Sequence, residues 1–264
     1  MDKFEFKKSF GQNFLKDKSI VDKIVNVIDY DKNNLVIEIG PGSGAMTKKL
    51  LPVVDKMLIY EIDTRLKDIL DEELKGYDNY DIIFDDFLNR NIKEDLSKYD
   101  YDNLYIVANL PYYITTPIIS KIVSSEIDVK EMVLMVQKEV ADRLSSKVGS
   151  REYGYITVIL NYYFVIDKVF NVSKNSFIPK PNVDSAVIRF RKRDNLLYLK
   201  DYKYFDKFLQ DAFRYKRKNI KNNLKGYDLD IIEEVLNKYG LNLNSRSEQV
   251  EYSIFVEIVN KLIK

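Results

Sequence analysis

Short apolar runs that alternate with amphipathic helical patterns through the first 140 residues constrain the fold of this chain more than any other feature. Five runs are expected as strands: Leu35–Ile39, Met57–Tyr60, Asp81–Phe84, Leu104–Ala108 and Met132–Val136. Helices are expected before and between them: Ser19–Ile28, Ala45–Leu50, Arg65–Leu74, Thr116–Val123 and Lys138–Ser145. Repeated strand–helix units build parallel sheets, so the sequence predicts an α/β domain.

The remainder of the chain predicts a change of architecture. The apolar run Tyr155–Val165 and the alternating segment Ala186–Phe190 are expected as further strands, antiparallel and at the edge of the sheet. Four amphipathic helices are expected after them: Asp201–Ala212, Arg217–Leu224, Asp230–Tyr239 and Ser247–Leu262. We therefore expect a main domain over residues 1–194 and a small all-helical domain over residues 195–264.

The absence of certain residue types excludes several kinds of chemistry. The 264 residues include no Cys, no His and no Trp, which excludes disulfides, thiolate nucleophiles, His-based metal sites and Ser-His-Asp machinery. We expect no bound metal. No apolar stretch approaches the roughly 18 residues of a membrane span, and the first residues lack the apolar region of a signal peptide. We therefore expect a cytoplasmic protein that does not bind membranes.

Charge is distributed unevenly along a chain whose net charge is only +1. Residues 55–102 hold 15 acidic against 7 basic side chains, whereas residues 138–225 hold 20 basic against 9 acidic ones. The first basic cluster comprises Arg189, Arg191, Lys192 and Arg193, and the second comprises Arg214, Lys216, Arg217, Lys218 and Lys221. Clusters of this kind favour a polyanionic partner such as RNA, although charged segments also commonly form solvated faces.

A glycine-rich turn follows the first predicted strand, in the segment VIEIGPGSGAMT at residues 36–47. Gly40 and Gly42 would let the backbone approach a ligand, and the N–H groups that open the next helix favour anions; a purely structural turn is the alternative. Glu61 and Asp86 follow the next two strands, so they are expected at the same sheet edge. There Glu61 can accept hydrogen bonds from both ribose hydroxyls of a nucleoside-containing cofactor, and Asp86 can bind an adenine amino group.

The fourth strand leads into NLPYYITTP, and the candidate catalytic residues are Asn109, Leu110, Pro111 and Tyr112. This motif resembles the signature of S-adenosylmethionine (SAM)-dependent enzymes that methylate the exocyclic amine of adenine. That amine is a poor nucleophile because its lone pair is delocalised into the ring. We expect the Asn109 side-chain oxygen and the Leu110 carbonyl to accept its N–H bonds and Tyr112 to stack on the extruded base. A Pro-containing turn capped by Asn is the structural alternative. Thr116 and Pro117 are expected to cap and open the next helix.

Nearly the whole chain resembles the KsgA (RsmA) family of small-subunit ribosomal RNA adenine dimethyltransferases. The resemblance rests on KKSFGQNFLKD (7–17), QKEVADRL (137–144), YGYITV (153–158), FIPKPNVDSAV (177–187) and AFRYKRKNIKNNL (212–224). It implies a Rossmann-like methyltransferase sheet with a small C-terminal helical RNA-binding domain. It also implies that SAM is bound by Asn13, Leu15, Glu38, Gly40, Gly42, Glu61, Asp86 and Asn109. Phe177 is implied to pack against the target base opposite Tyr112.

The resemblance further implies that SAM methylates N6 of two adjacent adenosines near the 3′ end of 16S rRNA, each twice, during maturation of the small ribosomal subunit. RNA phosphates would be held by Arg189, Arg191, Arg214, Lys216, Arg217, Lys218 and Lys221. One active site per chain needs no partner subunit, so a monomer is expected. Four residues depart from the usual family pattern: Asp85, Tyr113, Arg214 and Tyr215.

Three other functions fit parts of the sequence. An Erm-type methyltransferase shares the chemistry but acts on large-subunit RNA; the GPGSGAMT loop and the Thr116-Pro117 pair favour KsgA over it. A ribosome-assembly or transcription factor could keep the fold and bind RNA without catalysis, although Asn109, Tyr112 and the strand-end acids are all present. A DNA adenine methyltransferase is less favoured, because the basic residues interleave with Tyr and Phe in a helical module that resembles that of the ribosomal family.

Overall fold

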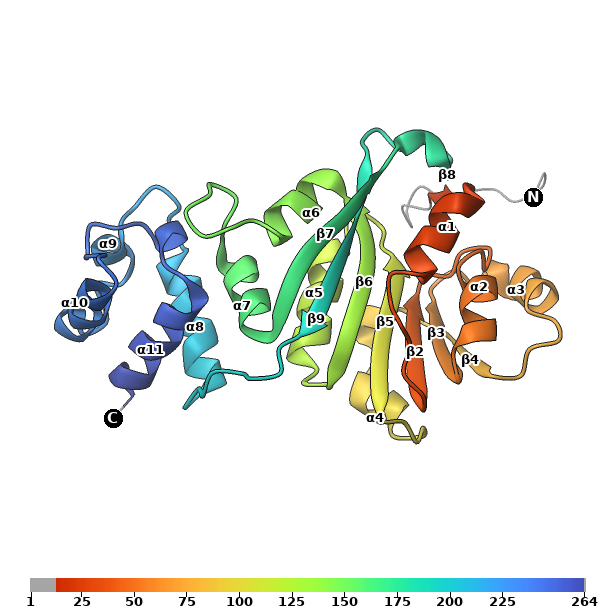
Figure 1. Cartoon of the computed structure of the whole chain (residues 1–264), viewed down its shortest axis with the longest axis horizontal. Helices are drawn as coiled ribbons and strands as arrows, with labels where there is room; N and C mark the ends of the chain where they lie inside the picture. The colour runs from red at the N-terminus through yellow and green to blue at the C-terminus, as the bar shows by residue number, and fades with distance from the viewer. Residues whose placement is uncertain (1–12, 264) are drawn as a thin grey trace. The chain divides into compact units, whose positions relative to one another are not determined.

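The computed structural model describes residues 13–263 and contains a seven-stranded mixed sheet (Figure 1). Its strand order is β4-β3-β2-β5-β6-β9-β7. The strands are β2 (Asn34–Ile39), β3 (Lys56–Glu61), β4 (Tyr80–Phe84), β5 (Asn103–Asn109), β6 (Val129–Gln137), β7 (Phe164–Val172) and β9 (Ser185–Lys192). The first five strands are parallel, and β9 is antiparallel to β6. The predicted α/β class and all five predicted parallel strands are therefore confirmed.

Helices pack against the sheet through alternate strand residues. On one face, Val36, Met57, Ile59 and Val107 share a buried cluster with apolar residues of α1 (Lys18–Val25), α2 (Thr47–Leu50) and α3 (Lys67–Glu73). Figure 1 shows α1 in front of the strands. Because side chains alternate along a strand, the intervening residues face the other side of the sheet. The other elements around this sheet are η2 (Leu51–Val53), η3 (Thr64–Leu66), η4 (Phe87–Asn89), α4 (Ile92–Leu96), α5 (Thr115–Ser124), α6 (Lys138–Leu144) and η5 (Lys174–Ser176).

A second, two-stranded sheet ties together two distant parts of the chain. In it, β1 (Phe14–Leu15) pairs antiparallel with β8 (Phe177–Ile178), so that Leu15 lies opposite Phe177. The backbone N–H of Lys16 also donates to the carbonyl of Ser176. These bonds anchor the segment that precedes α1 beside the segment that precedes β9.

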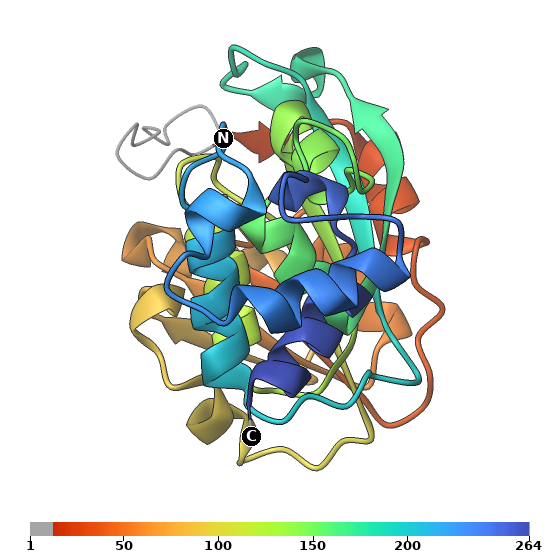
Figure 2. The same cartoon turned by 90° about the vertical axis from the view of Figure 1, so that its left-hand side faces the viewer.

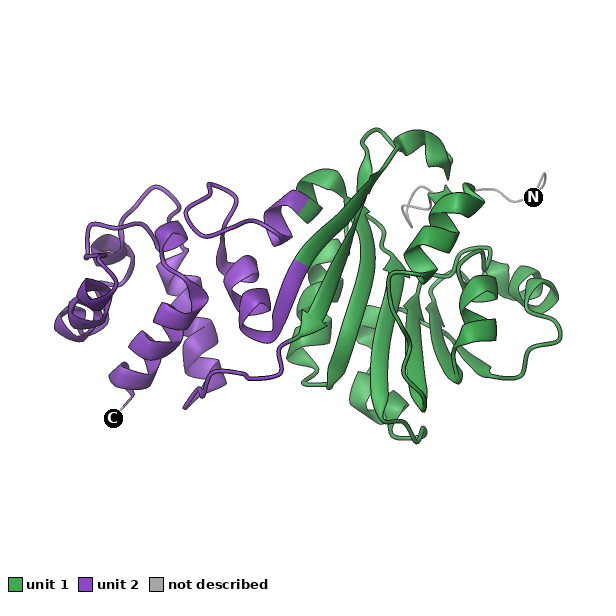
Figure 3. Cartoon of the chain, in the orientation of Figure 1, with its two compact units in different colours: residues 1–141, 167–192 green, residues 142–166, 193–264 purple. Residues whose placement is uncertain are grey.

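The chain forms two compact units, coloured separately in Figure 3. Unit 1 holds residues 1–141 and 167–192, and unit 2 holds residues 142–166 and 193–264. The later break lies close to the predicted boundary at 194, whereas residues 142–166, which the sequence prediction assigned to the main domain, group with the helices of unit 2. No helix within residues 13–263 combines the length and apolar character that crossing a membrane requires.

Unit 2 is a helical bundle with an aromatic core. Its later helices are α8 (Tyr202–Ala212), α9 (Ile220–Asn223), α10 (Leu229–Lys238), η6 (Ser247–Gln249) and α11 (Tyr252–Leu262). Figure 2 shows α10, in blue, running across α11, with which it is in contact. Phe208 of α8 packs edge-on against Phe255 of α11, with 6.3 Å between ring centroids. Asp201 and Asp228 accept backbone N–H bonds at the starts of α8 and α10, which explains where these helices begin.

Several predicted elements are corrected by the structure. The predicted strand Tyr155–Val165 is wrong, because residues 155–163 form helix α7 (Tyr155–Tyr163). Its residues Thr157–Leu160 are all buried, and a helix buried nearly all round has the same continuous apolar run as a buried strand. Strand β7 follows at once and was not predicted, because exposed Asp167 and Lys168 interrupt its apolar pattern. The predicted strand at 186–190 is antiparallel as expected but lies inside the sheet, since β7 forms the edge.

Two predicted helix starts also move. Helix α5 starts at Thr115 with Ile114 as its N-cap, and the Thr115 hydroxyl donates to the Pro111 carbonyl, so Thr116 does not cap it. The helix predicted from Arg217 begins only at Ile220, because the backbone turns at Tyr215–Lys218 and the Asn219 side chain caps the start of α9.

Candidate active site

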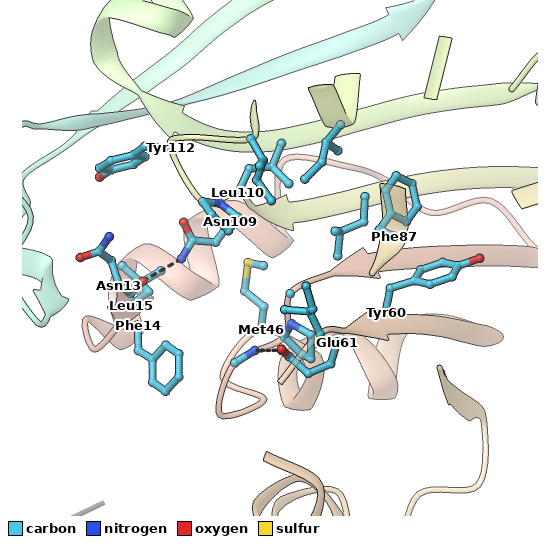
Figure 4. Close-up of a pocket in the computed structure, with 18 of the residues that line it drawn as sticks. Asn13, Phe14, Leu15, Met46, Tyr60, Glu61, Phe87, Asn109, Leu110 and Tyr112 are labelled. Atoms are coloured by element: carbon cyan, nitrogen blue, oxygen red, sulfur yellow. Dashed lines mark hydrogen bonds between the residues drawn. The ribbon is translucent and has the colours of Figure 1, made fainter. Parts of the chain in front are cut away.

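A pocket opens where β2, β3, β4 and β5 end, at the carboxyl edge of the sheet (Figure 4). It encloses about 1070 Å³ of atom-free space, part of which is open to solvent. Predicted site residues that line it are Asn13, Leu15, Gly40, Gly42, Glu61, Asp86, Asn109, Leu110, Pro111 and Tyr112. Gly40, Glu61, Asp86 and Asn109 thus share one cavity, as the strand-end argument predicts.

The glycine turn has a backbone that other residues rarely adopt. Gly40 and Gly42 have φ angles of 71° and 57°, in the left-handed region. At Gly42 a Cβ atom would also lie 3.0 Å from a ring carbon of Phe14, another pocket residue. The backbone N–H of Gly42 donates to Glu61 at 3.3 Å. The turn therefore needs glycine both for its dihedral angles and for the space that Phe14 occupies.

Glu61 lies at the end of β3 with only 4% of its surface exposed. Its Oε2 accepts the Gly42 N–H, and its Oε1 accepts the Asp63 N–H at 2.8 Å. Burial raises the pKa of the Glu61 carboxyl to about 7, against the opposing effect of these backbone hydrogen bonds. Two backbone hydrogen bonds thus hold the Glu61 carboxyl in place, while burial disfavours its ionised form. A bound ligand that donated further hydrogen bonds would stabilise the ionised form.

Glu38 lies beneath the glycine turn and is completely buried. The Thr47 hydroxyl donates to Glu38 Oε2 at 2.6 Å, while Oε1 has no hydrogen-bond partner among the described residues. Burial raises the pKa of Glu38 to about 8, and the nearby negative charge of Glu61 adds to the effect. Glu38 is not one of the pocket-lining residues, so the structure places it behind the pocket rather than in it.

Asp86 and Tyr113 occupy another part of the pocket wall. Asp86 caps η4 by accepting the Leu88 N–H at 2.9 Å. Tyr113 is 57% exposed, and partial burial together with the nearby charge of Asp86 raises the pKa of its hydroxyl. Tyr113 therefore lies on the side of the pocket where Asp86 is, next to the Asn109–Tyr112 motif.

The Asn109–Tyr112 motif extends from the end of β5 into the pocket. The Asn109 side-chain N–H donates to the Asn13 carbonyl at 3.1 Å, as the dashed line in Figure 4 shows. No described residue donates to the Asn109 side-chain oxygen. The backbone N–H of Leu110 donates to Met135 of β6, and the hydroxyls of Tyr112 and Ser185 are 2.7 Å apart. The motif is therefore fixed at three points, and its Asn109 side-chain oxygen accepts from none of residues 13–263.

Comparison with known proteins agrees with this geometry. The sequence model of the family described as ribosomal RNA adenine dimethylase matches residues 3–264. The chain belongs to this family. Two relatives, from Bacillus cytotoxicus and Bacillus mycoides, are each 39% identical over 269 residues, which cover 98% of this chain and 92% of theirs. Both are named ribosomal RNA small subunit methyltransferase A.

Solved structures support the same assignment. A dimethyladenosine transferase from Plasmodium falciparum superposes with a TM-score of 0.79 at 26% identity, covering 94% of this chain and 96% of that one. The 23S rRNA methyltransferase ErmE superposes with a TM-score of 0.77 at 25% identity, covering 96% and 100%. As a member of the ribosomal RNA adenine dimethylase family, this enzyme is a SAM-dependent RNA adenine methyltransferase.

The predicted residues outside the pocket are placed differently. Phe177 is 2% exposed, packs in the core and does not line the pocket. Residues 7–12 of the opening segment lie outside the described residues. The sequence prediction missed pocket residues Phe14 and Phe87, each next to a predicted one, and Met46, which lies within the glycine-rich segment at residues 36–47. Their proximity to the motifs was the only available signal. Within residues 13–263 no cluster of three or more acidic side chains is placed to hold a metal ion.

The two basic clusters differ in their partners. In the first, Arg189 pairs with buried Glu131, Arg191 with Asp167 at 2.8 Å and Lys192 with Asp128 at 2.5 Å. In the second, no ion pair within the described residues includes Arg214, Lys216, Arg217, Lys218 or Lys221, and all but Asn219 in residues 214–219 are exposed. The second cluster therefore carries the positive charge that is available to a partner.

Proposed function

We propose that this enzyme transfers methyl groups from SAM to N6 of two adjacent adenosines near the 3′ end of 16S rRNA, each twice. The observation that carries the proposal is the convergence of Glu61, Asp86 and the Asn109–Tyr112 motif on one pocket. The names of the bacterial relatives favour the small ribosomal subunit as substrate. The proposed setting is small-subunit maturation in the cytoplasm, by a monomer that uses no metal.

The pocket residues fit SAM. Glu61 offers a buried carboxylate, already supported by two backbone N–H groups, to the ribose hydroxyls. Asp86 would accept a hydrogen bond from the adenine amine, and the turn at Gly40, where a Cβ would meet nothing within 4 Å, leaves room for close backbone approach. Asn13 and Leu15 would close over the donor, with Glu38 supporting the methionine end from behind. SAM supplies a methyl group on a positively charged sulfur.

The chain's own residues would activate the target amine. Because the Asn109 N–H is committed to the Asn13 carbonyl, its side-chain oxygen is oriented to accept a hydrogen bond from the adenine amine. The Leu110 carbonyl would accept the second N–H. These bonds pull the nitrogen toward tetrahedral geometry, and the amine can release its proton after attack, so no general base is required.

Aromatic side chains would position the base. Tyr112 is half-buried and tied to Ser185 by its hydroxyl, which leaves its ring as a firm stacking surface. Phe177 is the proposed second stacking residue. Since it is only 2% exposed, contact with the base requires displacement of the side chains that cover it.

Labelled SAM tests the proposal directly. The enzyme is incubated separately with small and large ribosomal subunits that lack the modification, and the labelled nucleotides are then located. We expect label only in the small subunit, on two neighbouring adenosines as N6,N6-dimethyladenosine. Label confined to the large subunit would support the Erm-type alternative. The superposition on ErmE, a 23S rRNA methyltransferase, is the observation behind that alternative. Absence of label in both would support an RNA-binding factor without catalysis.

A further inference from the structure

The turn between α8 and α9 presents an aromatic ring flanked by two cations. The Lys218 ammonium lies 4.6 Å from the ring centroid of Tyr215, and the guanidinium carbon of Arg214 lies 5.7 Å from it. Tyr215 is nevertheless 50% exposed. We call these three residues the Tyr215 platform. Both cations have solvent-exposed side chains, so either can leave the ring for a nearby anion while the ring stays accessible.

The backbone that carries the Tyr215 platform is fixed by hydrogen bonds. The Asn223 side-chain N–H donates to the carbonyls of Ala212 at 2.8 Å and Tyr215 at 3.3 Å, and the Lys218 N–H donates to the Tyr215 carbonyl at 2.9 Å. Next to it, Phe213 packs against Phe255 of α11, 5.8 Å between centroids. The ring is therefore presented at low entropic cost, as a stacking surface should be.

Charge near the Tyr215 platform is mainly positive. Lys216, Arg217 and Lys221 are close to it along the chain, are exposed and form no ion pair among the described residues. The nearby acid on α8, Asp211, also feels the charge of Arg214, but its hydrogen bonds go to Lys207 and to the Tyr227 hydroxyl. The comparably exposed Tyr239 of the same unit differs, because its hydroxyl donates to Glu257. A polyanion that also offers flat aromatic groups matches the platform, and an unpaired stretch of RNA has both properties.

We propose that Tyr215 stacks on an unpaired RNA base, while Arg214 and Lys218 contact the phosphates on either side. The inference rests on the proposed function for the identity of the polyanion, and it adds a single-stranded element to the region that the enzyme recognises. Base-paired RNA does not fit, because its bases are stacked on one another and hidden from the ring. Stacking on an aromatic ring tolerates any base, so the platform selects strandedness rather than sequence.

Binding of the full-length protein to short RNAs tests this inference. The probes are a single-stranded RNA and a duplex of equal length, each measured at several salt concentrations. We expect Tyr215→Ala to weaken single-strand binding about tenfold, within the range for one stacked base. Duplex affinity and the salt slope should stay unchanged, because no phosphate contact is removed. Tyr215→Phe should bind like the wild type.

Two further variants complete the design. Tyr198→Ala removes another exposed tyrosine of unit 2 and should leave both affinities unaltered. Arg217→Ala should show the opposite pattern, weaker binding to both RNAs with a shallower salt slope. Unchanged single-strand affinity of Tyr215→Ala, or an equal loss for duplex, would overturn the inference. Methylation of ribosomal subunits is scored separately, so loss of that activity with the stacking pattern intact would reject only the proposed function.

Discussion

The side-chain N–H of Asn109 donates to the backbone carbonyl of Asn13 across 96 positions of sequence, at 3.1 Å. This bond joins the end of β5 to the residue before β1, and β1 in turn is paired with β8. It also decides the orientation of the Asn109 amide, whose oxygen is left to accept. Residues 13–15 therefore both line the pocket and hold the Asn109–Tyr112 motif in place.

Replacement of Asn109 by Ala should abolish methyl transfer and leave the fold intact. The variant loses the proposed acceptor for the adenine amine, and loss of one such group typically lowers kcat by about 10²–10³. Turnover is measured with labelled SAM, and folding by the unfolding midpoint in urea. Asn103→Ala, at the opposite end of the same strand, is the matched control and should retain activity. An N109A enzyme with near-normal turnover would refute the assigned role.

SAM binding should weaken as the pH falls below about 7. The Glu61 pKa is raised to about 7, and in the proposed site the ribose hydroxyls of SAM donate to the ionised carboxylate. Below that pH most Glu61 carboxyls are protonated and must lose the proton before SAM binds. The affinity for SAM therefore falls by up to about tenfold for each pH unit below the pKa. Calorimetry from pH 5.5 to 8.5 measures the trend. Glu61→Gln should bind weakly at every pH, and Glu61→Ala should lose SAM affinity more than RNA affinity.

The control for this experiment is Glu73→Gln, an exposed carboxylate paired with Lys48. It should follow the wild-type pH profile. If Glu61→Ala kept full SAM affinity, Glu61 would not belong to the cofactor site.

Glu38 should make the protein without ligand less stable as the pH rises. In the unfolded chain its carboxyl titrates near 4.5, whereas burial raises the folded-state pKa to about 8. Below pH 4.5 both states are protonated and the penalty is absent. Between pH 4.5 and 8 the unfolded state loses this proton, whereas the folded state must keep it or bury a charge. Each unit of difference between the two pKa values lowers the free energy of unfolding by roughly 1.4 kcal/mol. The free energy of unfolding should therefore fall over this interval.

Glu38→Gln isolates that effect. The amide oxygen can still accept from Thr47, while the titrating group is gone. In urea unfolding at pH 5 and 8.5, the variant should gain stability relative to the wild type at the higher pH, and that gain should shrink toward the lower pH. An equal difference at the two pH values would show that Glu38 does not titrate in this range.

The parallel sheet and its site were predictable because both follow from local patterns. Apolar runs fixed the strands, and the edge rule for parallel strands brought Gly40, Glu61, Asp86 and Asn109 together. Helix α7 was not predictable, since continuous burial gives helix and strand the same apolar run. Its first residue follows Gly154, which ends the preceding loop but does not indicate the type of element that comes next.

The contacts of charged and aromatic residues could not be predicted from the sequence either. Arg189 and Glu131 are 58 positions apart and meet only because β9 lies beside β6. Phe177 occupies the core because β8 pairs with β1, a contact between two-residue strands that leaves no periodic pattern. Composition identified two basic clusters, but only tertiary structure shows that Arg189, Arg191 and Lys192 of the first are paired with acids, whereas no described acid pairs with the second.

Because the cations of the second cluster have no ion-pair partner among the described residues, RNA binding through them should depend on salt concentration. Replacing Arg217 and Lys218 together by Ala should lower affinity for single-stranded RNA and make the dependence of log K on log salt shallower by about 1.4, because each phosphate contact on a single strand contributes about 0.7. Arg191→Ala is the matched control: it removes an exposed cation that is already paired with Asp167, so its slope should match the wild type. Affinities are measured by fluorescence anisotropy at four salt concentrations. A double variant with the wild-type slope would mean that Arg217 and Lys218 are only solvated. A shallower slope in Arg191→Ala would mean that the first cluster also contacts RNA phosphates.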